Sequence, residues 1–372
     1  NKMGAGIFPH LMLADEVARI ADLESQFGFT KNSAADLATV PKGLAGITKA
    51  HSSVNATPWA FISLAVCMMA GTASLPHVMM RYFTTPSVKS ARRSVGWSLF
   101  FIFLLYSSAP MLATLSKLSL MDPNLTTGII GKSITEVQNI DWYQNWNQAN
   151  LMFVSDFNGN GTLELNEFFM GGKAVVLATP EIAGLPYVIS GLVAAGGMAA
   201  AMSTADGLVL AISNALSHDI YYKMINPKAE TAKRLIVARV LLVLIGFAGA
   251  TIAALEIQGI LGSVIWAFDF AMSGLFFPLV LGVWWKRANA QGAVAGMLLG
   301  LISGTAYLIW VRNGGAGFWG VTQLTFGIVG SLVSLVSMIV VSLMTPAPDA
   351  ATQKMVDEVR VPSGRTVLGK QH

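Results

Sequence analysis

Residues 184–213 read GLPYVISGLVAAGGMAAAMSTADGLVLAIS, a long apolar stretch whose one charged side chain is Asp206. A helix needs roughly 20 such residues to cross a bilayer, and the run lacks the alternation of a membrane strand. It therefore predicts a transmembrane helix. Comparable runs lie near 59–80, 95–116, 235–256, 260–285, 292–311 and 321–344. Together they predict an all-α polytopic membrane protein with about seven transmembrane helices.

The composition of the whole chain agrees with this prediction. Of the 372 residues, 53% are hydrophobic and 12% are charged, whereas soluble domains carry about 25% charged residues. The net charge of +4 is small and spread over several loops, which indicates cytoplasmic loops and no nucleic-acid partner. The single cysteine, Cys67, excludes a disulfide framework and a thiolate metal site.

Lysine and arginine concentrate in alternate loops, and such basic loops face the cytoplasm. They are Arg81, Lys89, Arg92 and Arg93; Lys223, Lys228, Lys233 and Arg234; and Lys286 and Arg287. This pattern predicts an extracytoplasmic segment 1–57, two transmembrane helices in 58–116 and an extracytoplasmic loop 117–183. Five helices follow in 184–345, and 346–372 forms a cytoplasmic tail. The expected location is the cytoplasmic (inner) membrane, with the lipid bilayer as partner.

Two of the apolar runs contain helix-breaking residues. Proline removes a backbone donor and glycine loosens the helix, and both occur in Gly71-Thr-Ala-Ser-Leu-Pro76. The run 184–213 begins near Pro186 and contains Gly196-Gly197. Transporters use broken helices at membrane depth to hold ions and solutes. The alternative is a packing kink.

Small polar residues in the run 184–213 suggest an ion site. Ser203 and Thr204 lie in a stretch of small residues, and hydroxyl oxygens suit a hard cation such as Na⁺. Alternatively, these hydroxyls bond back to their own helix or join helices. An ionisable group inside an apolar run marks an ion or proton path by default, so Asp206 and Asp269 are further candidates, with structural pairing as the alternative.

The loop 117–183 contains a separate motif, DFNGNGTLELNE, at residues 156–167. It satisfies the twelve-residue EF-hand calcium loop, with glycine at position 6 for the sharp turn. The expected Ca²⁺ ligands are Asp156, Asn158, Asn160, Thr162 through its carbonyl, Glu164 through water, and Glu167. Three carboxylates predict a weak extracellular site. The alternative is a turn rich in Asn and Gly.

Several segments together resemble the sodium:solute symporter family, in particular its acetate and short monocarboxylate permease branch. They are Gly71–Phe83 with Ser90–Ser94, Ala200–Thr204 with Asn214–Tyr221, Trp266–Ala271, and Pro278–Arg287. The resemblance covers about 58–345. It implies the C-terminal part of a five-plus-five inverted-repeat (LeuT-like) transporter, with core helices 6 and 7 in 58–116 and core helices 8–10 plus two more in 184–345.

The resemblance also assigns roles to particular residues. Ala200, through its carbonyl, and the hydroxyls of Ser203 and Thr204 would bind the coupling Na⁺, while Gly71 and Thr72 would lie near the break that lines the substrate cavity. Asp206 is not part of the family's common sodium site, so a coupling role for it is a separate hypothesis. The calcium loop is not a general family feature. Because the chain starts at Asn1, we expect a fragment without its true N-terminus. The resemblance implies that the first five core helices are missing from it.

The sequence thus predicts sodium-coupled symport of a small organic solute, with acetate or a related monocarboxylate as the expected substrate. The alternatives are a transporter-like membrane sensor and a proton-coupled transporter. No catalytic cluster emerges, so an enzyme is not expected. The pattern leaves open the solute, the sodium stoichiometry and a small membrane subunit.

Overall fold

The structure, a computed structural model, describes residues 14–27, 33–41, 44–46, 58–80, 82, 85–172, 174–255 and 259–360. The predicted segment 1–57 and tail 346–372 lie partly outside these residues, as does Arg81 of the first basic loop. The chain divides into two compact units. Unit 1 comprises Asn1–Ser53 and Gly96–Met202; unit 2 comprises Val54–Val95 and Ser203–His372.

Six helical stretches of the described chain are long and apolar enough to cross a bilayer. They are Val88–Met121, Tyr187–Ile225, Thr231–Ala254, Ile260–Trp284, Ala290–Arg312 and Gly327–Met344. The remaining predicted run forms α4 (Pro58–Ser74) and α5 (Pro76–Met79), which are separated at Leu75. Leu75 is extended because a residue before proline is pushed out of the helical region. The prediction of an all-α polytopic membrane protein is confirmed.

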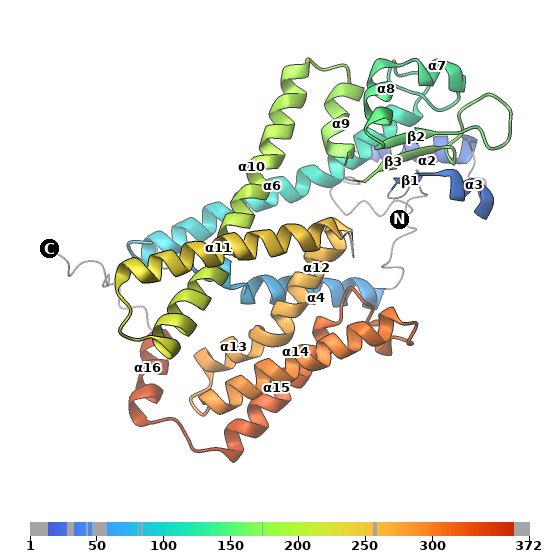
Figure 1. The fold of residues 1–372 in the computed structure, drawn as a ribbon. Helices are drawn as coiled ribbons and strands as arrows, with labels where there is room; N and C mark the ends of the chain where they lie inside the picture. The colour runs from blue at the N-terminus through green and yellow to red at the C-terminus, as the bar shows by residue number, and fades with distance from the viewer. Residues whose placement is uncertain are drawn as a thin grey trace. The chain divides into compact units, whose positions relative to one another are not determined.

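Unit 1 joins membrane helices to a small α/β subdomain (Figure 1). Its helices are α2 (Ala14–Phe27), α3 (Ala34–Thr39), most of α6 (Val88–Met121), α7 (Ile134–Gln138), α8 (Asp141–Gln148), α9 (Val175–Ile182) and the first part of α10 (Tyr187–Asn214). One antiparallel sheet has the order β1 (Leu44–Gly46), β3 (Phe168–Gly171), β2 (Met152–Val154). Its core contains Phe168, Leu165 and Ile130, together with Ile20 of α2.

The sheet adds strands that the sequence did not predict. Leu44 pairs with Gly171, and Met152 pairs with Met170. Each strand has only three or four residues, which is too short to show a period of two. Because β1 pairs with β3, residues 44–46 and 168–171 share one side of any membrane that the chain crosses. An even number of crossings between them is therefore required, in agreement with one at α4–α5 and one at α6.

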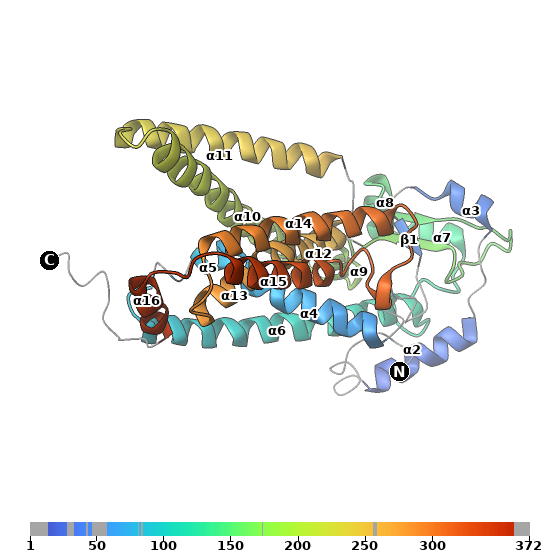
Figure 2. The same ribbon diagram turned by 90° about the horizontal axis from the view of Figure 1, so that it is seen from below.

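Unit 2 contains the second part of α10, a π-helical continuation at Ala215–Ile225, α11 (Thr231–Ala254) and α12 (Ile260–Ala271). A π-helical turn at Met272–Phe276 leads into α13 (Phe277–Trp284), followed by α14 (Ala290–Arg312), α15 (Gly327–Met344) and α16 (Ala350–Arg360). Figure 2 shows α14 and α15 side by side. α4 and α12 are also direct neighbours.

The α14–α15 contact depends on glycine at every fourth position of α14. Gly292, Gly296, Gly300 and Gly304 are all buried, and they form the small-residue face that lets membrane helices approach closely. A Cβ atom at Gly292 would lie 2.0 Å from Oγ of Ser342 on α15. The backbone approach at this contact therefore leaves no room for a side chain.

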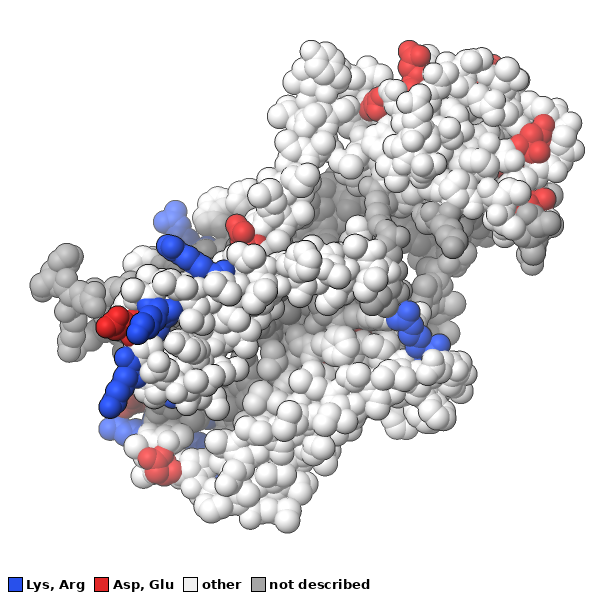
Figure 3. Space-filling view, in the orientation of Figure 1, with Lys and Arg blue, Asp and Glu red and all other residues white. Residues whose placement is uncertain are grey.

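Contacts at the end of α13 place α16 beside it. Arg360 donates to the carbonyls of Val283 and Trp284 at 3.0 and 2.7 Å, and Lys286 pairs with Asp357 at 2.7 Å. Residues 283–286 and α16 thus share one side, as two crossings at α14 and α15 require. In Figure 3, Lys and Arg of unit 2 gather near α16 and the start of α11.

Candidate ion-binding sites

The three predicted sodium ligands all lie on α10. Ala200 and Ser203 are three positions apart and Ala200 and Thr204 four, so they share one face of the helix. All three are exposed. α10 runs without interruption through Gly196-Gly197, so a break at these glycines, which the sequence suggested, is not present. The helix changes only after Asn214, where the π-helical turn begins.

The oxygen atoms on this face are of the type that a hard cation binds, but there are too few of them to complete a site. Two hydroxyl oxygens and one carbonyl are the groups that such an ion prefers. A backbone carbonyl inside a helix is already an acceptor within the helix, and hard cations take more than three oxygen ligands. The ligand set on α10 is therefore partial, and a sodium site would need oxygens from another segment. Asp206 is also exposed on α10.

Gly71 and Thr72, near the break between α4 and α5, have different environments. Gly71 is buried against α12, where a Cβ atom would lie 2.6 Å from the Phe268 carbonyl oxygen. Thr72 is exposed, and its hydroxyl donates to the Met68 carbonyl at 2.6 Å. Gly71 therefore serves close packing of α4 on α12, and its neighbours Ala70 and Ala73 face a cavity instead.

That cavity, of about 530 Å³, lies in unit 2. Its walls are almost wholly apolar and include Met69, Met272, Phe276 and Ile328. A carboxylate solute needs a few well-placed polar groups in its pocket, and Ser331 is the only polar side chain that lines this cavity. The cavity is thus unsuited to bind a carboxylate by itself.

Asp269, the second intramembrane carboxylate, is fully buried in unit 2. It lies on α12 next to the start of α15, where a Cβ atom at Gly327 would be 2.9 Å from its Oδ1. Neither carboxylate oxygen has a hydrogen-bond partner among the described residues. The sequence identified the residue but not its neighbours, because they come from other helices.

The predicted calcium loop has a regular, self-bonded conformation in unit 1. Asp156 accepts hydrogen bonds from the amides of Gly159 and Gly161 at 2.7 and 2.9 Å. Asn158 accepts from the Asn160 amide, and Asn160 accepts from the Thr162 amide. Gly161 has φ +74°, which supplies the left-handed turn required at position 6.

The closing residue of the loop is firmly held. Glu167 is completely buried, and its two carboxylate oxygens accept from the amides of Phe157 and Glu164 at 2.9 and 3.0 Å. Glu164 accepts from the side-chain amides of Asn158 and Asn160. The acidic groups thus face the loop, but the described residues contain no cluster of three His, Cys, Asp or Glu side chains that could hold a metal ion.

The frame of the loop differs from an EF-hand, which has a helix on each side. Here β2 precedes the loop and β3 follows it. The eighth residue of the loop, Leu163, exchanges backbone hydrogen bonds with Gly131 and Lys132 at 2.9 and 2.8 Å. The segments on either side of the loop are therefore strands and not the helices of an EF-hand, and the calcium ligand set stays a prediction.

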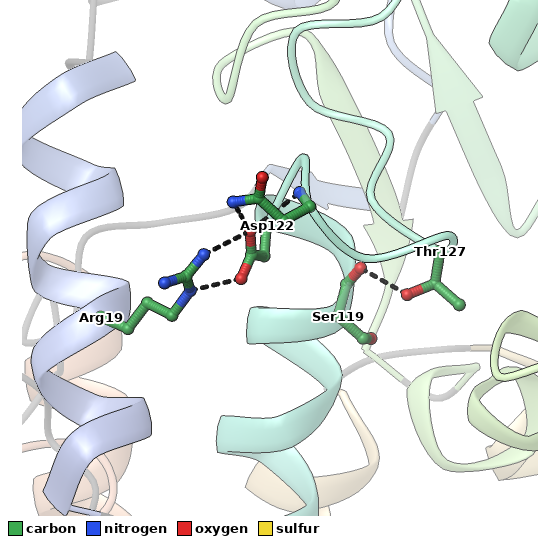
Figure 4. Close-up of polar contacts among 5 residues, drawn as sticks. Arg19, Ser119, Asp122 and Thr127 are labelled. Atoms are coloured by element: carbon green, nitrogen blue, oxygen red, sulfur yellow. Dashed lines mark hydrogen bonds and ion pairs between the residues drawn. The ribbon is translucent and has the colours of Figure 1, made fainter.

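Two salt bridges join α2 to the end of α6, and the sequence did not reveal them. Arg19 donates two hydrogen bonds to Asp122, one of them from Nη2 to Oδ1 at 2.9 Å (Figure 4). Lys117 pairs with Glu24. The Arg19 guanidinium lowers the pKa of Asp122 to about 2. These partners are about a hundred residues apart, so no local pattern could indicate them.

Comparison with known proteins gives a consistent identification. Residues 173–300 match the family model described as Sodium:solute symporter family. An uncharacterized symporter of Cupriavidus necator is 41% identical over 310 residues, which are 81% of this chain and 44% of that protein. A monocarboxylic acid transporter of Corynebacterium glutamicum is 29% identical over 245 residues, 65% of this chain and 37% of that protein.

The matched segments thus cover less than half of the length of either relative. Both relatives are described as transporters, in agreement with the predicted monocarboxylate branch. The family match contains all of α10, α11, α12 and α13. The resemblance inferred from the sequence is confirmed, and residues 173–300 of the chain match the sodium:solute symporter family.

Proposed function

We propose that this chain forms part of a secondary active symporter in which inward movement of Na⁺ drives uptake of acetate or a related small monocarboxylate. The observation that carries the proposal is the family match over residues 173–300, which contain the exposed hydroxyls of Ser203 and Thr204 on an apolar helix. The substrate class rests on the relative described as a monocarboxylic acid transporter.

In this proposal Ser203, Thr204 and the Ala200 carbonyl contribute to a Na⁺ site that other segments complete. Preferential binding of Na⁺ to the outward-facing state would raise the population of that state before the solute binds. The break at Leu75 fits the broken helices of such transporters, whose binding sites lie near the middle of the bilayer. Thr72 and Asp206 remain proposed contributors to the solute cavity or to coupling.

The orientation in the membrane is part of the same proposal. We place the α/β subdomain of unit 1 outside the cell and α16 in the cytoplasm, across the cytoplasmic membrane. Support comes from the basic residues near α16 and the start of α11 and from the positive-inside rule. The five-plus-five fold belongs to the complete protein.

The sodium site can be tested with the double variant Ser203→Ala plus Thr204→Ala in the complete transporter. Labelled acetate uptake is measured against sodium concentration. We expect half-maximal uptake to require at least about tenfold more sodium, which corresponds to about 1.4 kcal/mol of lost binding. An unchanged sodium dependence would exclude these residues as ligands.

Ser107→Ala plus Ser108→Ala is the matched control for this experiment. These adjacent hydroxyls lie on the membrane helix α6, and they bond back to their own helix at 2.7 and 2.8 Å. We expect sodium dependence like that of the wild type. A similar loss in both double variants would indicate a general effect of removing hydroxyl groups from a membrane helix.

We also propose that the loop 156–167 binds Ca²⁺ through Asp156, Asn158, Asn160, the Thr162 carbonyl, Glu164 and Glu167. The support is the complete set of ligand positions and the glycine turn at position 6. A loop of this kind outside the cell typically has a dissociation constant of about 10⁻⁴–10⁻³ M. Binding would stabilise the α/β subdomain, because Glu167 lies in its interior.

Calcium titration with thermal unfolding as the readout tests this site. Ca²⁺ at about 100 times its dissociation constant should stabilise the native state by about 2.7 kcal/mol. Glu167→Gln should remove the effect, whereas Glu136→Gln, an exposed residue outside the loop, should keep it. The absence of any Ca²⁺-dependent stabilisation in the wild type would rule out the site.

A further inference from the structure

The buried carboxyl of Asp269 lies where three helices of unit 2 meet. α12 carries Asp269, α4 packs against α12 at Gly71, and the first residues of α15 lie against Asp269 itself. Asp269 has no exposed surface, and neither of its oxygens has a hydrogen-bond partner among the described residues. A charged group in the middle of a membrane protein is expensive and is by default a functional site.

The groups that face this carboxyl carry no positive charge. From α4 the facing titratable group is Cys67, a fully buried thiol that donates to the Thr325 carbonyl at 3.7 Å. At the start of α15 the backbone of Gly327 lies against it without hydrogen-bond geometry, and neither α15 nor the turn Met272–Phe276 has a titratable side chain.

The one basic residue of α14, Arg312, contacts an aromatic ring. Arg312 lies over the ring of Trp266, one turn before Asp269, at 5.4 Å from the ring centroid. The other titratable side chain of the described α14 is Tyr307, whose hydroxyl bonds to the backbone of Val321 and Phe318. No described Lys, Arg or His forms an ion pair with Asp269.

The tight packing favours a proton over a metal ion as the ligand. A Cβ atom at Gly327 would lie within 3.1 Å of three atoms of Asp269, and Asp269 does not line the apolar cavity between α4, Met272 and Ile328. A metal ion needs space and several oxygen ligands. A proton needs neither, and it removes the charge that burial penalises.

Next to Asp269, a π-helical turn and a small-residue contact allow the packing of the helices to change. The π-helical turn Met272–Phe276 follows Asp269 directly, and π-turns inside helices occur often at functional sites. Ser273 donates to the Asp269 carbonyl at 2.7 Å, and it lies against Gly300 and Gly330 of the two neighbouring helices. A shift of α4 or α12 away from α15 would therefore expose the Asp269 carboxyl.

We propose that the carboxyl of Asp269 is a proton-binding site that stabilises the packed arrangement of α4, α12 and α15 and so makes the transport cycle sensitive to pH. In the packed state the O–H bond is intact. When the junction opens, that bond breaks, the proton passes to water and the electron pair stays on the carboxylate. Protons then favour the packed state by differential binding. The role in the cycle rests on the proposed transport function.

Infrared difference spectroscopy of the complete purified protein tests proton binding without any need for transport. We expect a carbonyl-stretch band of a protonated carboxylic acid that titrates with pH. It should be absent in Asp269→Asn and present at a shifted frequency in Asp269→Glu. The matched control is Asp219→Asn, an exposed aspartate in the π-helical segment, which should keep the band. A band that survives in Asp269→Asn, or no band at any pH, would overturn the proposal.

Uptake at a fixed sodium gradient, measured over a series of pH values, tests the role in the cycle. The wild type and Asp219→Asn should show a pH dependence that approaches about tenfold per pH unit on its steep limb, as for one proton. Asp269→Asn should lose this dependence; equal pH profiles in all three proteins would refute the role. If uptake does not require sodium but the infrared band behaves as expected, the proposed function fails and the proton site stands.

Discussion

At the scale of single residues, buried charges of this chain fall into two environments. Asp122, at the end of α6, is nearly buried but receives hydrogen bonds from Arg19 and Asn124. Asp269 is buried, and no Lys, Arg or His of the described residues forms an ion pair with it. The first arrangement holds two segments together, because the charge is neutralised locally. The second leaves a charge that only a proton or a rearrangement can relieve.

The Arg19–Asp122 pair predicts a specific pH dependence of stability. The pKa of Asp122, about 2, is below the ordinary value of about 3.9 for aspartate. Its stabilising contribution is therefore fully present above about pH 4 and is lost as the pH falls towards 2. In thermal unfolding, Asp122→Asn should be less stable than the wild type at neutral pH, and the difference should shrink in acid.

The control for this experiment is Asp141→Asn, an exposed aspartate at the start of α8 in the same unit. It should be close to the wild type at every pH. If the difference between Asp122→Asn and the wild type stays constant from neutral pH to pH 2, the ion pair does not act as described.

At the scale of elements, the sequence predicted the membrane helices well because each consists of a long apolar run that is visible in the local sequence. It also predicted the break before Pro76, since proline acts locally. It did not predict the β1–β3–β2 sheet, the contact of Gly71 with Phe268, or the cation-free surroundings of Asp269. These features depend on contacts between residues that are distant in the chain, and local sequence patterns cannot predict such contacts.

Glycines of α14 give a prediction at this scale. In Gly300→Ala the new Cβ would lie 2.1 Å from the Ser273 carbonyl oxygen and 2.8 Å from Ser334 Cβ. We expect a loss of about 1–3 kcal/mol of stability, as for overpacking, measured by thermal unfolding in detergent.

The matched variant is Gly249→Ala on α11, where a Cβ atom would meet nothing within 4 Å. Alanine is the better helix former by about 1 kcal/mol, so this change should be neutral or stabilising. Equal effects of the two substitutions would contradict close packing between α14 and α15.

At the scale of the whole molecule, the contacts within each unit constrain how the chain crosses the membrane. The β1–β3 pairing and the contacts of Arg360 with residues 283 and 284 each require an even number of crossings between the partners. The sequence could predict this alternation from the positions of Lys and Arg. It could not predict which other residues would complete the proposed sodium site, because one helix face carries only part of a ligand set.

Cysteine labelling in intact cells tests the proposed orientation. Cys67 is fully buried, so the native thiol should not react. Asn139→Cys, in the α/β subdomain, should react with a membrane-impermeant maleimide added outside. Lys228→Cys, between the π-helical segment and α11, should react only after permeabilisation. The reverse pattern would invert the topology.

The central claim is that a sodium gradient drives the uptake of a small monocarboxylate. The most direct measurement is accumulation of labelled acetate in proteoliposomes that contain the complete transporter. An inward sodium gradient is compared with an equal potassium gradient, at the same pH on both sides of the membrane. We predict accumulation above equilibrium with sodium and only equilibration with potassium. Equal accumulation with both cations, or none with sodium for acetate and its close relatives, would contradict the account.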